Sequence, residues 1–288
     1  MNGSTPNQAT RWSNAAAAST LLWISRTLLG LWVSYPLVLA IRASSLSSGP
    51  DGDAVLFQPG SLLLLELLRL AAAPLSSALQ LSLLLAALSA ILELVPLALA
   101  LDLLWLPGRP LFERLTRALR VFPRFLALSA IALLAQAGLL LAASLLGALF
   151  KPALSSVDER LQSVLPIALL GVGLFLGGCF GGVLDIARAT LVRRGLRECR
   201  ARAALAQALL CFKTRPFRVL FGMYPSVAGG ALAFLTAAWL LARQDPAASS
   251  NAAAITLAFG AHQLAVLFAI AWRVRWLGLA LELSRASD

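Results

Sequence analysis

Four polar residues stand deep inside long apolar stretches of this sequence, where polar groups are costly to bury. They are Glu93, Gln136, His262 and Gln263. At about 1.5 Å of helix rise per residue, all four lie at a similar depth, measured from the basic end of each stretch. A carboxylate at such a depth in a hydrocarbon layer costs at least about 2.5 kcal/mol, so Glu93 should be neutral, paired or in contact with water.

A contact between Glu93 and His262 would serve one of two roles. The pair could relay protons, because histidine changes its charge near neutral pH, or it could simply satisfy two buried polar groups. The rest of the sequence does not favour catalysis. It has no GxxxxGK[ST], HExxH or GxSxG motif, and its single histidine has no obvious serine partner. We therefore expect no catalytic site, no metal site and no cofactor.

The composition places these residues in a membrane protein. The 288 residues are 59% hydrophobic and 13% charged, whereas soluble domains carry about 25% charged residues. Apolar segments of about 20 residues, enough to cross a bilayer, recur along the chain. We predict an all-α polytopic membrane protein with one transmembrane domain over residues 15–288, after a polar tail at 1–14. The six predicted spans are 15–41, 75–104 (kinked near Pro96), 125–150, 164–187, 219–242 and 253–272.

The distribution of charge predicts the orientation of the chain. The net charge is +11, and two arginine-rich loops hold fourteen of the 24 basic residues. The three loops on the other side hold four basic and five acidic residues. Because basic loops stay in the cytoplasm, both termini should be cytoplasmic. The heavy use of arginine, alanine and leucine is typical of a GC-rich genome, so we expect a bacterial inner membrane. The tendency of basic loops to stay in the cytoplasm also accounts for the positive net charge, so we do not expect nucleic-acid binding.

The two basic loops also contain amphipathic stretches, at 109–122 and 190–212, which predict helices lying flat in the interface. Such helices could anchor the spans, or their arginines could bind anionic headgroups or a cytoplasmic partner. The candidate binding residues are Arg114, Arg117, Arg120, Arg193, Arg197 and Arg200. A third segment, 61–74, could be either a short interfacial helix or part of the second span.

A glycine-rich run in the fourth span predicts close helix packing. Small-xxx-small spacing lets a second helix approach the backbone, although a flexible hinge is the alternative. The glycines concerned are Gly173, Gly177, Gly178, Gly181 and Gly182. The three cysteines, Cys179, Cys199 and Cys211, have no CxxC spacing, so we expect free thiols.

A weak internal echo links the second and fourth spans. The first ends in ALDLLW and the other in VLDIAR, so that Asp102 and Asp185 stand at comparable positions before a basic stretch. Repeats of this kind occur in transporters, but a match of a few residues can also arise by chance.

Three functions are compatible with these features. The leading expectation is a non-enzymatic subunit or scaffold of a membrane complex, which contacts anionic lipids and docks a protein partner or a second copy through its basic face. The alternative is a small transporter or channel whose path includes Glu93 and His262. The third is an enzyme that modifies lipids, which the missing catalytic motifs disfavour.

Overall fold

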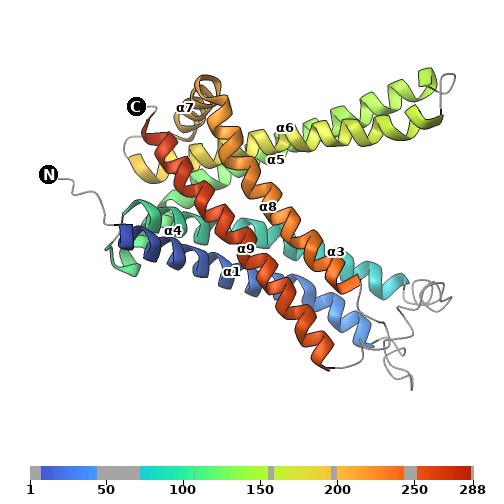
Figure 1. The fold of residues 1–288 in the computed structure, drawn as a ribbon, viewed down its shortest axis with the longest axis horizontal. Helices are drawn as coiled ribbons and strands as arrows, with labels where there is room; N and C mark the ends of the chain where they lie inside the picture. The colour runs from blue at the N-terminus through green and yellow to red at the C-terminus, as the bar shows by residue number, and fades with distance from the viewer. Residues whose placement is uncertain are drawn as a thin grey trace. The chain divides into compact units, whose positions relative to one another are not determined.

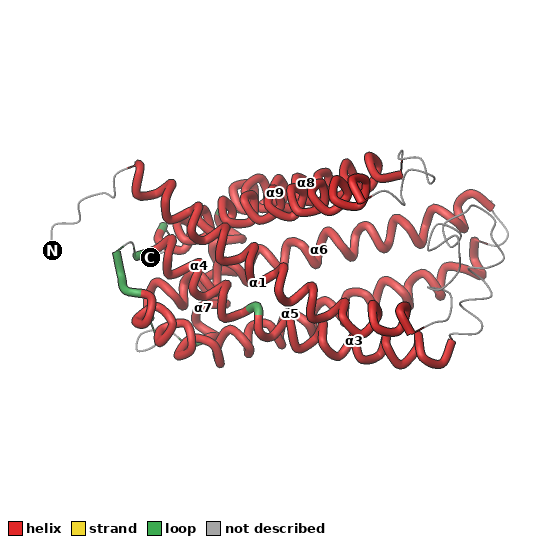
Figure 2. The backbone as a smooth tube through the Cα atoms, turned by 90° about the horizontal axis from the view of Figure 1, so that it is seen from below, coloured by secondary structure: helices red, strands yellow, loops and turns green. Residues whose placement is uncertain are grey.

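A computed structural model describes residues 8–43, 72–106, 108–154, 159–195, 200–242 and 252–286, and the regular structure in these ranges is entirely α-helical. Figure 2 shows the helices and the short loops between them. The all-α prediction is confirmed. The helices are α1 (Gln8–Ala43), α3 (Ala72–Leu92), α4 (Leu94–Trp105), α5 (Leu111–Leu154), α6 (Glu159–Arg194), α7 (Ala201–Thr214), α8 (Pro216–Ala242) and α9 (Ala252–Arg285).

Five helical segments of the described chain are long and apolar enough to cross a membrane. They are Trp12–Ala40 in α1, Ser76–Trp105 across α3 and α4, Leu111–Leu149 in α5, Gly171–Arg194 in α6 and Phe259–Arg285 in α9. The shortest has 24 residues, more than the roughly 20 that a hydrocarbon core requires. The predicted span 219–242 falls within α8, which is not among these five segments.

The chain divides into two compact units. Unit 1 holds Leu101–Ser226 together with the chain end from Arg275, and therefore contains α5, α6, α7 and the adjoining ends of α4, α8 and α9. Unit 2 holds Asn7–Ala100 and Val227–Val274, and therefore contains α1, α3 and the remaining parts of α4, α8 and α9.

In unit 1, α5 and α6 form an antiparallel hairpin and pack along each other (Figure 1). The structure corrects one prediction here: α5 is a single helix of 44 residues, not a surface helix at 109–122 followed by a separate span. The helix continues through Pro123 because a stripe of buried residues at helical spacing packs on both sides of the proline. These residues are Ala118, Val121, Phe125 and Leu128.

The second predicted surface helix, at 190–212, is also corrected. Helix α6 continues to Arg194, and Gly195 ends it with a φ of +74°. The Gly195 N–H donates a 3.1 Å hydrogen bond to the carbonyl of Leu191. Glycine adopts this left-handed conformation without the steric cost that a side chain brings, and it commonly terminates helices in this way. A new helix, α7, then begins at Ala201.

In unit 2, α1 packs along α3, and the second predicted span is interrupted near Pro96, where a kink was predicted. The helix is interrupted at Glu93, between α3 and α4. Pro96 has no N–H to donate to the carbonyl four residues earlier, at Leu92, and its ring crowds that carbonyl. The predicted interfacial segment 61–74 lies outside the described residues, except for its last three, which begin α3.

Candidate functional site

A buried charge network joins the ends of α4 and α5 in unit 1. Asp102 stands in the last turn of α4 and is 2% exposed. Its Oδ2 accepts a 3.2 Å hydrogen bond from Arg114 Nη1, and Arg117 Nε lies 3.2 Å from Oδ1. Arg114 is itself 4% exposed. Charges so far removed from water are tolerated when they are paired, so each partner needs the other.

Arg114 also binds the backbone that follows α4. Its Nη2 donates a 2.7 Å hydrogen bond to the carbonyl of Leu106, and its Nε donates a 2.9 Å bond to the carbonyl of Arg109. The last carbonyls of a helix have no partner within the helix and carry partial negative charge. One guanidinium therefore neutralises Asp102, satisfies the end of α4 and holds it against the first turns of α5.

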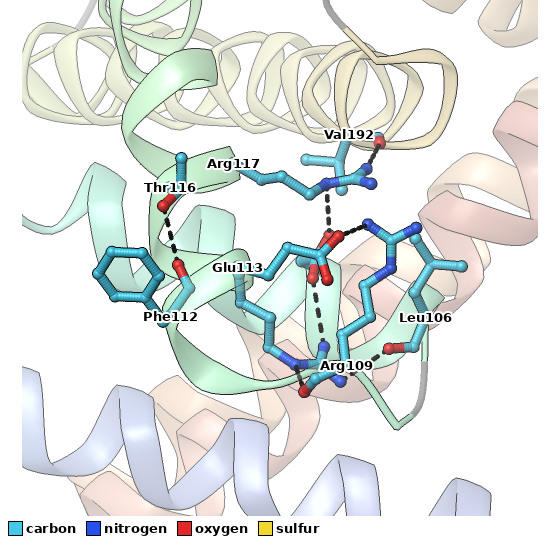
Figure 3. A network of polar contacts seen from close by, with 9 residues as sticks. Leu106, Arg109, Phe112, Glu113, Thr116, Arg117 and Val192 are labelled. Carbon is cyan, nitrogen blue, oxygen red and sulfur yellow. Dashed lines mark hydrogen bonds and ion pairs between the residues drawn. The ribbon is translucent and has the colours of Figure 1, made fainter.

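Two more arginines bind the ends of other helices. Arg117 Nη2 donates a 3.2 Å hydrogen bond to the carbonyl of Val192 in the last turn of α6 (Figure 3). Arg193 Nη2 donates a 2.9 Å bond to the carbonyl of Ser284 in the last turn of α9. The C-terminal ends of α4, α6 and α9 thus each receive a guanidinium, which complements both their free carbonyls and their dipoles.

A second network surrounds Asp185, which is 1% exposed on α6. Its Oδ1 accepts a 3.2 Å hydrogen bond from Arg188 Nη1, and its Oδ2 accepts a 2.8 Å bond from Trp276 Nε1 on α9. Arg188 Nη2 continues to Ser129 Oγ on α5 at 2.7 Å, and its guanidinium carbon lies 6.0 Å from the centre of the Phe125 ring. This network joins α5, α6 and α9.

Sequence reasoning noted Asp102 and Asp185 as a possible repeat but did not predict them as site residues. In both, the carboxylate oxygens face cations or N–H groups of the protein itself. Such carboxylates hold neighbouring helices together rather than present a free oxygen to a substrate. The available signal was an acid inside an apolar segment, which requires a partner wherever it is buried.

These contacts change the interpretation of three arginines that were candidates for lipid or partner binding. Arg114 is buried against Asp102, and Arg117 and Arg193 bind helix ends. Their guanidinium groups make contacts within unit 1, so we do not assign them to a docking surface. Arg120 and Arg200 are exposed, and Arg197 lies outside the described residues.

A different set of basic residues is exposed on α7 and at the start of α8. We call it the α7–α8 basic surface, and it comprises Arg202, Lys213, Arg215 and Arg218. Exposed apolar side chains alternate with these charges: Leu209, Leu210, Phe217 and Phe221. The opposite side of α7 buries small residues at helical spacing, namely Ala204, Ala208 and Cys211.

In unit 2, the structure pairs Glu93 with Arg26. Arg26 Nε lies 2.6 Å from Glu93 Oε1, and the two side chains are 39% and 33% exposed. Both residues belong to segments long enough to cross a membrane. Arg26 was not among the predicted site residues, because nothing local in the sequence connects it to a carboxylate 67 positions away.

The other polar residues predicted at this depth are placed as follows. Gln263, on α9, accepts a 3.0 Å hydrogen bond through Oε1 from Trp23 Nε1 on α1. His262, next to it, is exposed. Gln136 is an exposed residue of α5 in unit 1. Trp23 precedes Arg26 by one helical turn, so the face of α1 that meets Glu93 also meets α9.

The glycines of α6 approach two different neighbours. A Cβ on Gly173 or Gly177 would lie 3.9 Å from Ala143 or Gln136 of α5. A Cβ on Gly182 would come within 2.5 Å of Met223 Sδ on α8. Gly222 of α8, which sequence reasoning missed, is packed still more closely, against Leu279 and Trp276.

Gly222→Ala is expected to destabilise the protein by about 1–3 kcal/mol through overpacking. The new methyl group would overlap Leu279 and lie 3.0 Å from the Trp276 ring. That ring cannot retreat without losing its bond to Asp185. Gly181→Ala is the matched control, because a Cβ there meets nothing within 4 Å. Melting temperatures in detergent should fall for Gly222→Ala and stay level or rise for the control.

Cys211 is expected to be an unreactive thiol. It is 2% exposed, and burial raises its pKa from the ordinary 9.0 despite the nearby charges of Arg215 and Arg218. In a variant with Cys211 as its only cysteine, maleimide labelling at pH 8 should be slow until the protein is unfolded. Above about pH 9, the unfolded thiol ionises before the folded one, so its contribution to stability should fall as the pH rises. Rapid labelling of the folded protein would contradict this burial.

No group of three or more His, Cys, Asp or Glu side chains in the described ranges is placed to hold a metal ion. No protein-family model, curated protein or solved structure matches this chain. Its function is therefore inferred from the geometry described above.

Proposed function

We propose that this protein is a non-enzymatic subunit or scaffold of a membrane complex, and that it docks a protein partner through the α7–α8 basic surface. One observation carries the proposal: the arginines of unit 1 fall into two sets. Arg114, Arg117 and Arg193 hold helix ends together inside the unit. The basic residues of the α7–α8 surface are instead exposed to the surroundings.

The surface has the composition of a docking site. Phe217 and Phe221 are 72% and 76% exposed, with ring centres 6.5 Å apart, and Arg215 and Arg218 are exposed beside them in the sequence. Aromatic residues and arginine are enriched in protein interfaces and at their energetic centres. A partner with acidic residues would complement the charge and associate faster because of it.

The expected position of the α7–α8 basic surface relative to the membrane supports the same function. The positive-inside rule places the basic loops, and with them α7, in the cytoplasm of a bacterium, with the two termini on the same side. The buried networks at the ends of α4, α5, α6 and α9 would then form a rigid support for the docking surface at the cytoplasmic boundary.

Copurification of the intact protein in mild detergent tests this function. Wild type should bring down a stoichiometric partner, and the Lys213→Gln/Arg218→Gln variant should lose it. Arg120→Gln/Arg285→Gln removes the same charge from exposed sites elsewhere in unit 1 and should retain the partner. If wild type carries no partner protein, or if both variants retain it equally, the docking proposal is wrong. A variant that loses only anionic lipid would identify the surface as a membrane anchor instead.

A second function, transport or conduction, is favoured by the Arg26–Glu93 ion pair. Ionisable residues within transmembrane segments are rare, and they commonly mark a substrate or ion pathway. Glu93 stands at the single-residue interruption between α3 and α4, and both side chains of the pair are more than 30% exposed.

A further inference from the structure

We propose that Arg26 forms a binding site for a small anion, such as a carboxylate or an inorganic oxyanion, and that Glu93 is the internal counter-ion with which the ligand competes. The site lies in unit 2 and does not involve the α7–α8 basic surface. The inference rests on the proposal that α1 and the α3–α4 pair cross the membrane. It names a ligand class for the second of the two functions above.

Arg26 has N–H donors that do not bind Glu93. It stands midway along the apolar segment Trp12–Ala40. Its contact with Glu93 goes through Nε, at 2.6 Å, and its side chain is 39% exposed. Among the described residues, the structure records no hydrogen bond from Nη1 or Nη2. A guanidinium carries five N–H donors, so four of them remain for a ligand.

The chemistry of these donors selects an anion. Arginine does not lose its proton in proteins, so its charge needs an anion or water wherever it is buried. The Nη groups form a planar fork that matches the two oxygens of a carboxylate or oxyanion. A cation would be repelled by the same charge.

A second polar contact of α1 lies one helical turn from Arg26. The Trp23 indole N–H binds the Gln263 oxygen at 3.0 Å, which fixes the orientation of that amide. The Gln263 NH₂ group is consequently a donor facing away from the indole. Trp23 and Arg26 are one turn apart on α1, so the Gln263 amide meets the same face of α1 as the Arg26–Glu93 pair.

Because Glu93 and the ligand would share one guanidinium, variants of the two residues should act in opposite directions. Glu93→Gln removes the competing carboxylate and should strengthen anion binding. Arg26→Gln removes the receptor and should abolish it. A pair whose role is only structural would lose stability from either change and would show no gain of binding.

Iodide quenching of Trp23 fluorescence in the purified full-length protein measures this directly. The protein has seven tryptophans, so each variant is compared with the same variant carrying Trp23→Phe, and the difference isolates Trp23. Acrylamide, a neutral quencher, corrects the iodide result for the accessibility of Trp23. Caesium, a cationic quencher, tests whether the site prefers anions to cations. Size-exclusion chromatography verifies folding.

The same quenching measurement in nanodiscs distinguishes a free anion from a lipid headgroup as the ligand. Nanodiscs of zwitterionic lipid are compared with nanodiscs that also contain anionic lipid, since a headgroup bound at Arg26 would block iodide.

In wild type, the iodide quenching constant of Trp23, corrected for accessibility, should exceed the caesium quenching constant. It should rise by roughly twofold or more in Glu93→Gln, because one repelling unit charge is removed. In Arg26→Gln it should fall to the caesium level. The double variant Arg26→Gln/Glu93→Gln, which buries no charge, should behave like Arg26→Gln and covers the case in which a single variant does not fold. Equal quenching by iodide and caesium in wild type, or shifts of the same sign in both single variants, would overturn the anion site. Such a result would leave the copurification test of docking untouched.

Discussion

Asp102→Ala is expected to lower the free energy of unfolding by about 3–5 kcal/mol, because it leaves a buried guanidinium without its counter-ion. Arg114 is 4% exposed, so water cannot replace the lost carboxylate. The substitution also releases Arg117 Nε from the partner that it meets at 3.2 Å. Denaturant titration of the purified protein in detergent, with tryptophan fluorescence as the signal, measures the change.

Glu113→Ala is the matched control for this experiment. Glu113 also pairs with an arginine, Arg109, at 2.8 Å on the same stretch of chain, but the two side chains are 51% and 32% exposed (Figure 3). Exposed pairs are worth about 0–1 kcal/mol, because water and salt screen them. If the two substitutions cost the same, the network around Asp102 does not hold α4 and α5 together as described.

Asp185→Asn is expected to cost about 3 kcal/mol, although asparagine has nearly the same size as aspartate. Asp185 accepts a hydrogen bond on each oxygen, from Arg188 Nη1 and from Trp276 Nε1. An amide has one oxygen and one NH₂ group. In either orientation, therefore, a donor faces a donor, and the charge opposite Arg188 is also lost.

Glu282→Gln makes the same chemical change at an exposed position of α9 in unit 1 and should be nearly neutral. Trp276→Phe removes the donor to Asp185 and part of a ring that is 1% exposed. Its cost is expected to be at least about 1–3 kcal/mol, because one buried acceptor loses its hydrogen bond and the smaller ring leaves a cavity. An Asp185→Asn variant as stable as Glu282→Gln would mean that the second network is not formed in the protein.

The helices and the interruption near Pro96 followed from local features that a sequence displays directly. Long apolar segments predict helices because a chain in hydrocarbon must satisfy its own backbone. Pro96 predicts the break at Glu93 because a missing N–H and a steric clash act within one helical turn. Two boundaries were placed wrongly. Helix α5 continues through Pro123 because buried residues pack on both sides of it, and the predicted helix 190–212 is divided between α6 and α7 because Gly195 takes a positive φ.

The candidate sites were harder to predict because their contacts join distant parts of the chain. Arg26 and Glu93 are 67 positions apart, and Asp185 and Trp276 are 91 apart. Loop arginines were assigned to the surface because a basic loop beside a span usually meets headgroups. The sequence does not show that Arg114 turns back onto the end of the preceding helix. An acid within an apolar segment was the one usable signal, and it indicates that a partner exists without identifying it.

The docking proposal depends on the α7–α8 basic surface being cytoplasmic, and impermeant thiol labelling of intact cells tests this most directly. Single cysteines are introduced into a cysteine-free variant at Ser48 or Ser249, in loops predicted to lie outside the cytoplasm, and at Arg120 or Lys213, which are exposed on α5 and α7. Cysteines at positions 48 and 249 should react with the reagent in intact cells. Those at 120 and 213 should react only after the membrane is opened. Labelling of position 213 in intact cells, with 48 and 249 protected, would place the basic surface outside the cytoplasm and contradict the proposed function.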